Sequence, residues 1–293
     1  MSERADFVRA IRENLADDAP RLIAADWFEE HGQETRAEFI RVQVEAARLS
    51  PYGQRLVELN GRATTLERRH ERTWQPTLRD MATERVYRRG FVEKATITAD
   101  NFIRNYQTLF ELEPLNEIAL AQLLTRLPEL AACPGLLQLE GLDFSFQNLD
   151  AAYCRAFFGS KYLHRIRKLD VSGNYLGANG VHQIFNACFE NLTELAMART
   201  LGHTRSRNLF PPKHLPHLKK LDLANNDLPW SRLQTLRDTC FWSALEALDL
   251  RNNFLGTRLP ELFDGLQTSQ LRELAFTCHD VRDVDFERTF TSL

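Results

Sequence analysis

The chain has 293 residues, of which 43% are hydrophobic and 26% charged, so it can bury a sizeable core and is neither disordered nor collagen-like. Its net charge is -3, and residues 1–90 contain Arg as their only basic residue type, balanced by acids, so long-range attraction to nucleic acid is not expected. The first residues are charged and no run of about 18 apolar residues occurs, so we expect neither secretion nor membrane insertion and a cytoplasmic location.

Residues 1–80 carry apolar residues at helical spacing and predict a small all-helical domain. Three helices are marked by stripes: Phe7, Ile11 and Leu15; Phe39, Val42, Ala46 and Leu49; and Leu56, Leu59, Ala63 and Leu66. Asp18 and Pro20 predict the start of another helix, which Gly32 ends. Thr35 and Glu38 predict a capping box at the start of the helix that follows.

The stretch FVRAIRENLADDAPRLIAADWFEEHGQETRAEFIRVQ, residues 7–43, resembles the bacterial repeat-companion domain. It contains the three sequence blocks of that family, at residues 17–22, 25–30 and 36–41, and RRGFVEKATI at 88–97 resembles the junction before the family's repeats. The resemblance implies that a repeat region follows. It implies no biochemical activity.

Asp26 and Trp27 lie at the centre of this stretch, and an architectural role explains both. A carboxylate between apolar neighbours needs a hydrogen-bond donor, so we expect Asp26 to pair with Arg36 or Arg41 of the following helix. Trp27 would then anchor the helices to each other and to the first repeat.

Functional interpretations of the same region stay open. Trp27, Glu29 and Glu30 are candidates for a secondary partner-binding surface. Catalysis by Asp26 and its acidic neighbours together with His31 is less favoured, because consecutive helical residues point in different directions whereas acid–base groups must converge.

A repeat begins at Val92. LKKLDLANNDL from Leu218 and LEALDLRNNFL from Leu245 share the pattern LxxLxLxxNxL. The same pattern starts at Leu139, Ile166, Leu192 and Leu271, and in weaker form at Val92 and Leu115, with starts 23 to 27 residues apart. It resembles the leucine-rich repeat of the ribonuclease-inhibitor-like kind. This resemblance implies an α/β solenoid, a right-handed arc with parallel strands on its concave side and helices on its convex side.

We therefore expect a helical repeat-companion domain at 1–80, a short junction at 81–90, and a leucine-rich-repeat solenoid at 91–293 with about eight repeats, the first two degenerate. No Gly/Ser/Pro-rich linker separates the parts, so one rigid body is expected. A solenoid needs its open end covered, and the helical domain is well placed to cap it.

The turn of each repeat offers a place for asparagine, which can bond backbone groups that the turn leaves unpaired. Asn174, Asn226 and Asn253 occupy it. Looser turns are expected where other residues replace it: Gln147, Thr200 and His279. The segment 199–215 has poor helical spacing and Pro211-Pro212, so it either covers the convex side or lies at the rim as a functional loop.

The residue inside each LxL forms a row across neighbouring strands, because equivalent positions stack about 5 Å apart. An architectural interpretation is that LDL is common in this repeat class. The functional alternative is a concave strip that binds a charged protein partner: Asp143, Asp170, Asp222, Asp249, Arg167, Lys168, Lys219, Lys220, Arg251 and Arg272. The neighbouring cations Lys168, Lys220 and Arg251 are expected to offset the repulsion between the aspartates. Phe146 is the main aromatic residue of the row.

The sequence favours neither a metal nor a cofactor. Nucleotide, hydrolase and calcium motifs are absent. His214 and His217 with His203 nearby lack a further ligand for zinc, and the acids at 280–287 lack the pattern of a calcium loop. Five cysteines form no CxxC pair, and three before strands are interpreted as buried apolar residues: Cys133, Cys188 and Cys240.

The sequence as a whole predicts a non-enzymatic recognition or scaffold protein whose concave face binds another protein, without nucleic acid or membrane partners. The alternative is a regulatory subunit that engages an enzyme or effector through its N-terminal helical domain. An enzyme would need convergent carboxylates, which the sequence does not provide.

Overall fold

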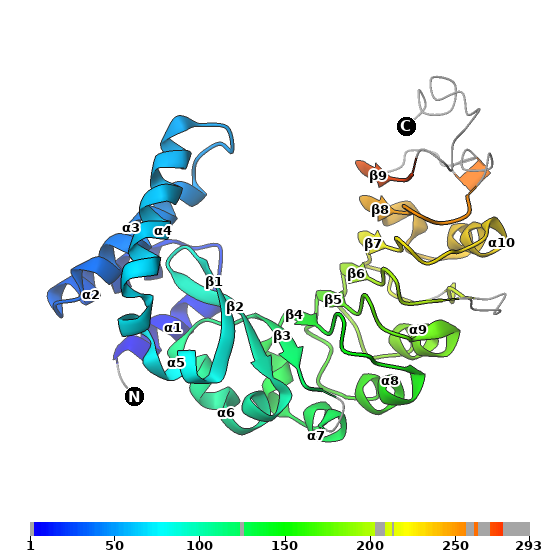
Figure 1. Ribbon diagram of the computed structural model, residues 1–293, viewed down its shortest axis with the longest axis horizontal. Helices are drawn as coiled ribbons and strands as arrows, with labels where there is room; N and C mark the ends of the chain where they lie inside the picture. Colours follow the sequence, from blue (N-terminus) through cyan, green and yellow to red (C-terminus); the bar gives the residue numbers. More distant parts are fainter. Residues whose placement is uncertain are drawn as a thin grey trace. The chain divides into compact units, whose positions relative to one another are not determined.

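The computed structural model describes residues 3–123, 126–202, 209–212, 214–255, 261–262 and 270–277 (Figure 1). The chain divides into two compact units, Met1–Leu120 and Ala121–Leu293. No helix within the described ranges is long and apolar enough to cross a membrane. The cytoplasmic location stays a prediction.

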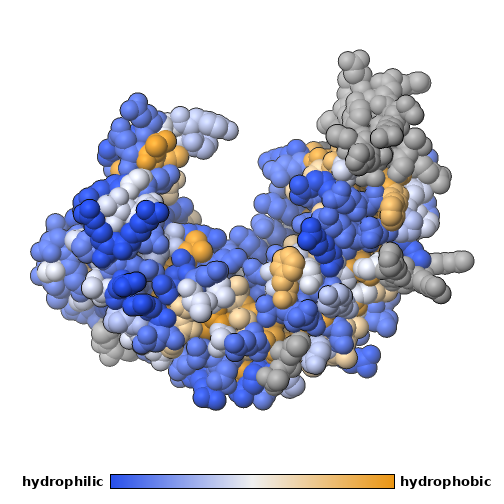
Figure 2. All heavy atoms as spheres, in the orientation of Figure 1, coloured by the Kyte–Doolittle hydropathy of each residue, from blue (hydrophilic) through white to orange (hydrophobic). Residues whose placement is uncertain are grey.

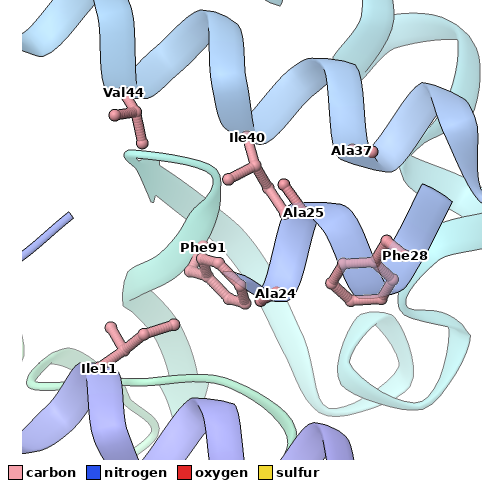
Figure 3. Close-up of a cluster of buried hydrophobic side chains, with 8 residues drawn as sticks. All are labelled: Ile11, Ala24, Ala25, Phe28, Ala37, Ile40, Val44 and Phe91. Carbon is pink, nitrogen blue, oxygen red and sulfur yellow. The ribbon is translucent and has the colours of Figure 1, made fainter. Parts of the chain in front are cut away.

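The first unit begins with helices, as the apolar stripes predict. They are α1 (Glu3–Glu13), α2 (Ala19–Glu30), α3 (Glu34–Ala47), α4 (Gln54–Trp74) and α5 (Pro76–Met81). The core shared by α1, α2 and α3 contains one aromatic ring from a later strand, Phe91 (Figure 3). The other residues of this core are Ile11, Ala24, Ala25, Phe28, Ala37, Ile40 and Val44. The helices therefore complete their core with a residue of the first repeat.

Gly32 ends α2, as predicted. It adopts a left-handed φ of +70°, which favours glycine. In this conformation Gln33 N donates to Phe28 O at 2.8 Å and Gly32 N donates to Glu29 O at 3.1 Å, so two carbonyls at the helix end are satisfied.

The predicted capping box at Thr35 and Glu38 is wrong. The cap position of α3 is Gln33, so Thr35 lies inside the first turn. Glu38 instead accepts two hydrogen bonds of 2.6 Å from Arg62 on α4. The carboxylate is stabilised more by a guanidinium on the neighbouring helix than by a backbone N–H.

The segment 81–90, expected as a short junction, contains a strand and a tight turn. Strand β1 (Ala82–Arg88) pairs antiparallel with β2 (Phe91–Thr98). Both turn residues, Arg89 and Gly90, have positive φ, which matches the right-handed twist of a two-residue hairpin. A Cβ at Gly90 would lie 2.5 Å from Ile40 Cγ1, so glycine is required where the hairpin meets α3.

The first unit continues with α6 (Ala99–Leu112) and β3 (Glu117–Ala121), and β2 lies between β1 and β3 in the sheet. Strands β2 and β3 correspond to the two degenerate repeats that begin at Val92 and Leu115. Thr98 caps α6 by accepting a hydrogen bond from Asn101 N at 3.2 Å.

Buried charges connect the helices to the first repeat. The fully buried Glu113, just after α6, accepts hydrogen bonds from Val92 N at 2.8 Å and from Gln75. Arg36 of α3 lies 3.5 Å from the Glu113 carboxylate and Arg4 of α1 lies 3.4 Å from it. Four other parts of the chain therefore meet at the Glu113 carboxylate.

A second buried pair makes a similar connection. Arg21 of α2 donates to Glu93 of β2 at 2.5 Å, and both side chains are buried. Burial raises the pKa of Glu93, although Arg21 and other cations act in the opposite direction. The desolvation of this carboxylate outweighs its favourable neighbours.

The described residues of the second unit form six parallel strands in chain order. They are β4 (Gly141–Asp143), β5 (Lys168–Asp170), β6 (Glu194–Ala196), β7 (Lys220–Asp222), β8 (Ala247–Asp249) and β9 (Glu273–Ala275). The leucine at the centre of each of the first five strands is 2% exposed: Leu142, Leu169, Leu195, Leu221 and Leu248. One strand lies in each of the six sequence units that begin from Leu139 to Leu271.

Helical segments connect the strands. They are α7 (Leu127–Ala131), η1 (Pro134–Gln138), α8 (Ala151–Phe158), α9 (Gly177–Phe185), α10 (Trp230–Leu233), η2 (Gln234–Asp238) and η3 (Trp242–Ala244). Figure 1 shows α8, α9 and α10 together on one side of the strands. Phenylalanine rings fill the space beneath them, with Phe144 and Phe157 at 4.8 Å and Phe185 and Phe241 at 6.1 Å between centroids.

Buried asparagines hold the turns after the strands. Asn226 accepts hydrogen bonds from Thr200 N and Leu201 N at 2.7 and 2.9 Å, and donates to Met197 O and Leu223 O at 2.8 and 2.9 Å. Asn174 and Asn253 bond their turns in the same manner. Each amide therefore links two adjacent repeats.

The expected looser turn at Thr200 is wrong. Thr200 is buried and its hydroxyl donates to the previous strand at Val171 O at 3.1 Å, as the asparagine amides do, or to Ala198 O at 2.9 Å. Its carbonyl also accepts from Leu176 N at 3.1 Å. A hydroxyl can thus replace part of the amide's role. His279 lies outside the described residues.

The described parts of segment 199–215 pack inward on the helical side. Leu201, Leu209 and Phe210 are buried, and Phe210 lies 6.2 Å from Phe185 of α9. Apolar side chains from an irregular segment thus replace those of a helix.

The predicted burial of three cysteines is correct for one of them. Cys133 is buried, whereas Cys188 and Cys240 are exposed. Their thiols donate to backbone carbonyls, from Cys188 to Ser160 O at 2.9 Å and from Cys240 to His214 O at 3.2 Å. These two positions lie in loops after the helical segments, so helical spacing does not describe them.

Candidate partner-binding surface

The parallel register brings four aspartates into one row at the carboxyl ends of the strands. Asp143 is opposite Asp170, Asp222 is opposite Asp249, and Ala196 lies between the two pairs. This is the order that the repeat predicts. We refer to Asp143, Asp170, Asp222 and Asp249 as the Asp row.

Each member of the Asp row also holds the turn that follows it. The Oδ1 atom accepts a hydrogen bond from the backbone N–H two residues later, at 2.8 Å for Asp170 and Asp222 and at 3.0 Å for Asp143 and Asp249. Such local bonds are typical of aspartate in turns. The architectural interpretation of LDL thus has a physical basis. The bond to the turn does not neutralise the carboxylate, so each aspartate keeps its negative charge.

The cations of the predicted strip gather mostly at the opposite, amino ends of the strands. We refer to Arg167, Lys168, Lys219, Lys220 and Arg272 as the cationic edge; each is exposed and is either the first residue of a strand or the residue before it. Two residues of strand, about 7 Å, separate this edge from the Asp row. The surface therefore has a positive and a negative side.

The expectation that neighbouring cations offset the charge of the Asp row is correct for Arg251, which bonds Asp249 from its Nε at 2.9 and 3.0 Å. Lys220 instead pairs with a glutamate. Lys220 lies 3.5 Å from Glu194, and Lys219 lies 2.7 Å from Glu246. The lysines reach carboxylates of adjacent repeats at their own end of the strands, because those are nearer than the Asp row.

The electrostatic state of the Asp row is perturbed at Asp222. Burial raises the pKa of this carboxyl, the Ala224 N–H opposes that change, and the charges of Asp249 and Asp170 raise the pKa further. A positive group from a partner would relieve this repulsion.

Two exposed aromatic residues lie in the turns directly after β4 and β5. Phe146 is 66% exposed and Tyr175 is 73% exposed. The Phe146 ring lies on Gly173, where an added Cβ would be 2.4 Å from Cδ1 of the ring. We refer to Phe146 and Tyr175 as the aromatic pair.

Phe146 occupies a backbone position that does not suit a bulky residue. Its φ is +56°, in the left-handed region, and Asn225 and Asn252 hold the equivalent position in later repeats. This conformation costs about 1–2 kcal/mol for a residue with a Cβ, and asparagine tolerates it better. An exposed ring at such a position favours a role in binding. The sequence analysis singled out Phe146 and did not predict Tyr175. The feature that could have indicated Tyr175 is an aromatic residue at the variable position x of the NxL pattern.

The structure explains Asp26 and Trp27 by contacts within the helices. Asp26 and Glu29 each accept a 2.6 Å hydrogen bond from Arg41, which raises the pKa of the Arg41 guanidinium. Trp27 donates to Glu3 of α1 at 2.7 Å. Of the two predicted partners of Asp26, Arg41 is correct. Arg36 is wrong, because it is buried beside Glu113.

Trp27 is half-buried and packs against rings of its own unit, including Phe7 at 5.9 Å and His31 at 4.1 Å between centroids. Glu30 is exposed. A binding role for Trp27, Glu29 and Glu30 stays a prediction.

Metal-binding groups do not gather in the described ranges, where no three His, Cys, Asp or Glu side chains are close enough to hold an ion. His217 is exposed and His214 is partly buried. His203 and the acids at 280–287 lie outside the described residues.

Comparison with known proteins identifies the repeat. Residues 244–266, which include β8 and Asn253, match the Leucine Rich Repeat family. The chain therefore contains leucine-rich-repeat sequence. A solved structure titled "Crystal structure of TLR13-ssRNA13 complex" is similar at 16% identity over 68% of this chain and 38% of that chain, with a TM-score of 0.29. The N-terminal resemblance to the repeat-companion domain stays a prediction.

Proposed function

We propose that this chain is a non-enzymatic recognition or scaffold protein. Its repeats form a leucine-rich-repeat solenoid over residues 91–293, and the domain at 1–80 caps the first repeat. The side of the strands that bears the Asp row is the concave surface, and it binds another protein. Support comes from the match of residues 244–266 to a repeat that generally serves protein interaction.

One observation carries the proposal: the aromatic pair lies beside the first two members of the Asp row. Phe146 N donates to Ser172 O at 2.9 Å, so the turn after Asp143 lies directly against the turn after Asp170. Protein interfaces depend on a few buried aromatic residues surrounded by polar contacts. Exposed rings next to fixed carboxylates supply both.

The arrangement favours a partner segment with a basic residue beside an apolar one. The basic group would pair with Asp143 or Asp170, while the apolar side chain covers the rings. Acidic residues of the partner would face the cationic edge. Charge complementarity of this kind sets orientation and association rate more than affinity, so we expect a contact of moderate strength.

The test is capture of the partner with the tagged full-length chain, followed by affinity measurement with the purified partner. One variant changes all four members of the Asp row to Asn, which removes the charges and keeps an Oδ1 acceptor for each turn. A second variant carries Phe146→Asn and Tyr175→Asn, because asparagine already occupies the left-handed position in other repeats.

A matched control carries Glu190→Gln and Asp238→Asn, two exposed acids outside the strands. We expect the variant of the aromatic pair to weaken binding at least about tenfold, as for other interface anchors. The variant of the Asp row should weaken binding mainly through slower association. Equal binding by wild type, both variants and control contradicts the proposal.

The alternative surface is the exposed face of α2. Ile23, Trp27 and Glu30 follow helical spacing, and Ile23 is 57% exposed. This observation favours an effector-binding role of the helical domain. Loss of partner binding on Ile23→Ser, with no effect of the aromatic variant, would favour this alternative.

A further inference from the structure

A shallow cavity lies at the amino ends of β5, β6 and β7, at the opposite end of the strands from the Asp row. Its volume is about 280 Å³, at the lower limit for ligand sites. Its lining includes Arg167, Asn191, Thr193, Pro216, His217 and Lys219. The size suits a small polar group and not a large organic ligand.

The cavity results from the repeat. Arg167, Thr193 and Lys219 occupy equivalent positions directly before three consecutive strands. Arg167 and Lys219 are thus about 10 Å apart along the sheet. The shorter Thr193 leaves a notch between them, into which two long, flexible cationic side chains can reach from opposite sides.

The electrostatics of the notch are positive. None of the described residues that line it carries a carboxylate. The acids paired with its cations precede the strands on either side, β4 and β8. Glu140 lies 3.8 Å from Arg167, and Glu246 lies 2.7 Å from Lys219. Exposed pairs of this kind are weak, so a ligand with a higher charge can replace these carboxylates.

The hydrogen-bond donors are set for an anion with several acceptor oxygens. Arg167 and Lys219 line the cavity together with His217. Each of the three side chains can offer an N–H to a bound anion. The Asn191 amide donates to His164 O at 2.8 Å and has a second N–H. Thr193 is not a donor here, because its hydroxyl donates to Arg167 O at 3.1 Å.

We propose that this cavity is a binding site for a phosphate group, either inorganic phosphate or a phosphate monoester. A planar carboxylate presents two oxygens to one direction, whereas a tetrahedral phosphate accepts from several directions and carries more charge. The site shares Arg167 and Lys219 with the cationic edge of the proposed partner surface. The proposal does not rest on that function, because its test needs no protein partner.

The test is titration of the full-length chain with inorganic phosphate, followed by amide chemical shifts in two-dimensional NMR at constant ionic strength. Saturable shifts are expected at Arg167, Thr193 and Lys219. The double variant Arg167→Gln and Lys219→Gln should weaken phosphate binding at least about tenfold, since it removes two charge-assisted contacts. Arg165→Gln is the control, because Arg165 is exposed in the same segment and does not line the cavity.

Phosphoserine and acetate distinguish the ligand class. Saturable binding of phosphate or phosphoserine supports the proposal, and tighter binding of phosphoserine assigns the site to an ester. Linear shifts without saturation, equal binding of acetate, or unchanged binding by the double variant overturns it. An unchanged spectrum of each free variant outside the cavity establishes that the fold is intact.

Discussion

The buried pair of Arg36 and Glu113 provides the sharpest prediction about stability. The Arg36 side chain is 1% exposed and that of Glu113 is 0% exposed. At their separation of 3.5 Å, the attraction is about 5 kcal/mol for an effective dielectric constant of about 20. Five aromatic rings lie within 6 Å of the Arg36 guanidinium: Phe28, Phe39, Trp74, Tyr87 and Phe91.

Arg36→Met removes the charge and retains an unbranched side chain among these rings. The Glu113 carboxylate then remains buried with Arg4, which is partly exposed, as its nearest cation. Breaking a buried pair in this way destabilises a protein by about 3–5 kcal/mol. Because Arg4 offsets part of the loss, we expect about 3 kcal/mol for Arg36→Met and a similar value for Glu113→Gln.

The assay is a double-mutant cycle in chemical denaturation, with the fluorescence of Trp74 as the local probe, since its ring lies 5.0 Å from Arg36. The double variant lacks both charges, so its loss of unfolding free energy should be smaller than the sum by about 2 kcal/mol. The control is Arg62→Met, which breaks the exposed pair with Glu38 and should lower the unfolding free energy far less than Arg36→Met does. Additive losses, or a loss from Arg36→Met no larger than that of the control, would refute the reasoning.

Three further predictions concern single residues. Gly32→Ala should lower the unfolding free energy by about 1 kcal/mol through backbone strain alone, because φ at Gly32 is +70° and no atom lies near an added Cβ. Gly61→Ala within α4 should raise it, because alanine favours the helix. Thermal melts compare the two variants. Asn226→Ala should cost more than about 3 kcal/mol in denaturant unfolding, since two N–H groups and two carbonyls lose their partners. The pKa of Asp222 is higher in the folded state than in the unfolded state, so folding favours the protonated carboxyl. This contribution to the unfolding free energy is fully present at low pH and is lost as pH rises through the folded-state pKa. Asp222→Asn should therefore be more stable than wild type at pH 7, and the difference should disappear below about pH 3.5, the range where aspartate is protonated.

Much of the repeat region could be predicted from sequence because its signals are local. The spacing of Leu221 and Leu223 fixes which side of a strand is buried, and the distance between repeats fixes the register. The Asp row follows from these two facts alone. The sequence pattern expects asparagine at the turn, so it did not predict that Thr200 takes the same role. The turn requires a side-chain donor to the backbone of the preceding repeat, and a hydroxyl can supply it.

Contacts between distant segments could not be predicted in the same way. Asp26 had two plausible cationic partners on the following helix, Arg36 and Arg41, and the structure pairs it with Arg41. Glu113 attracts Arg36 because it is buried, and burial at that point depends on how α6 and β2 pack. The capping box failed for the same reason, since Arg62 lies on another helix.

The most direct test of partner binding on the strand side is site-specific photo-crosslinking in cells of the native host. A photoreactive phenylalanine analogue replaces Tyr175 in one variant and Tyr153 in the other; Tyr153 is 38% exposed on α8, among the helices. The account predicts a discrete crosslink to another protein from position 175 and none from position 153. A crosslink from position 153 alone, or the same product from both positions, would contradict it.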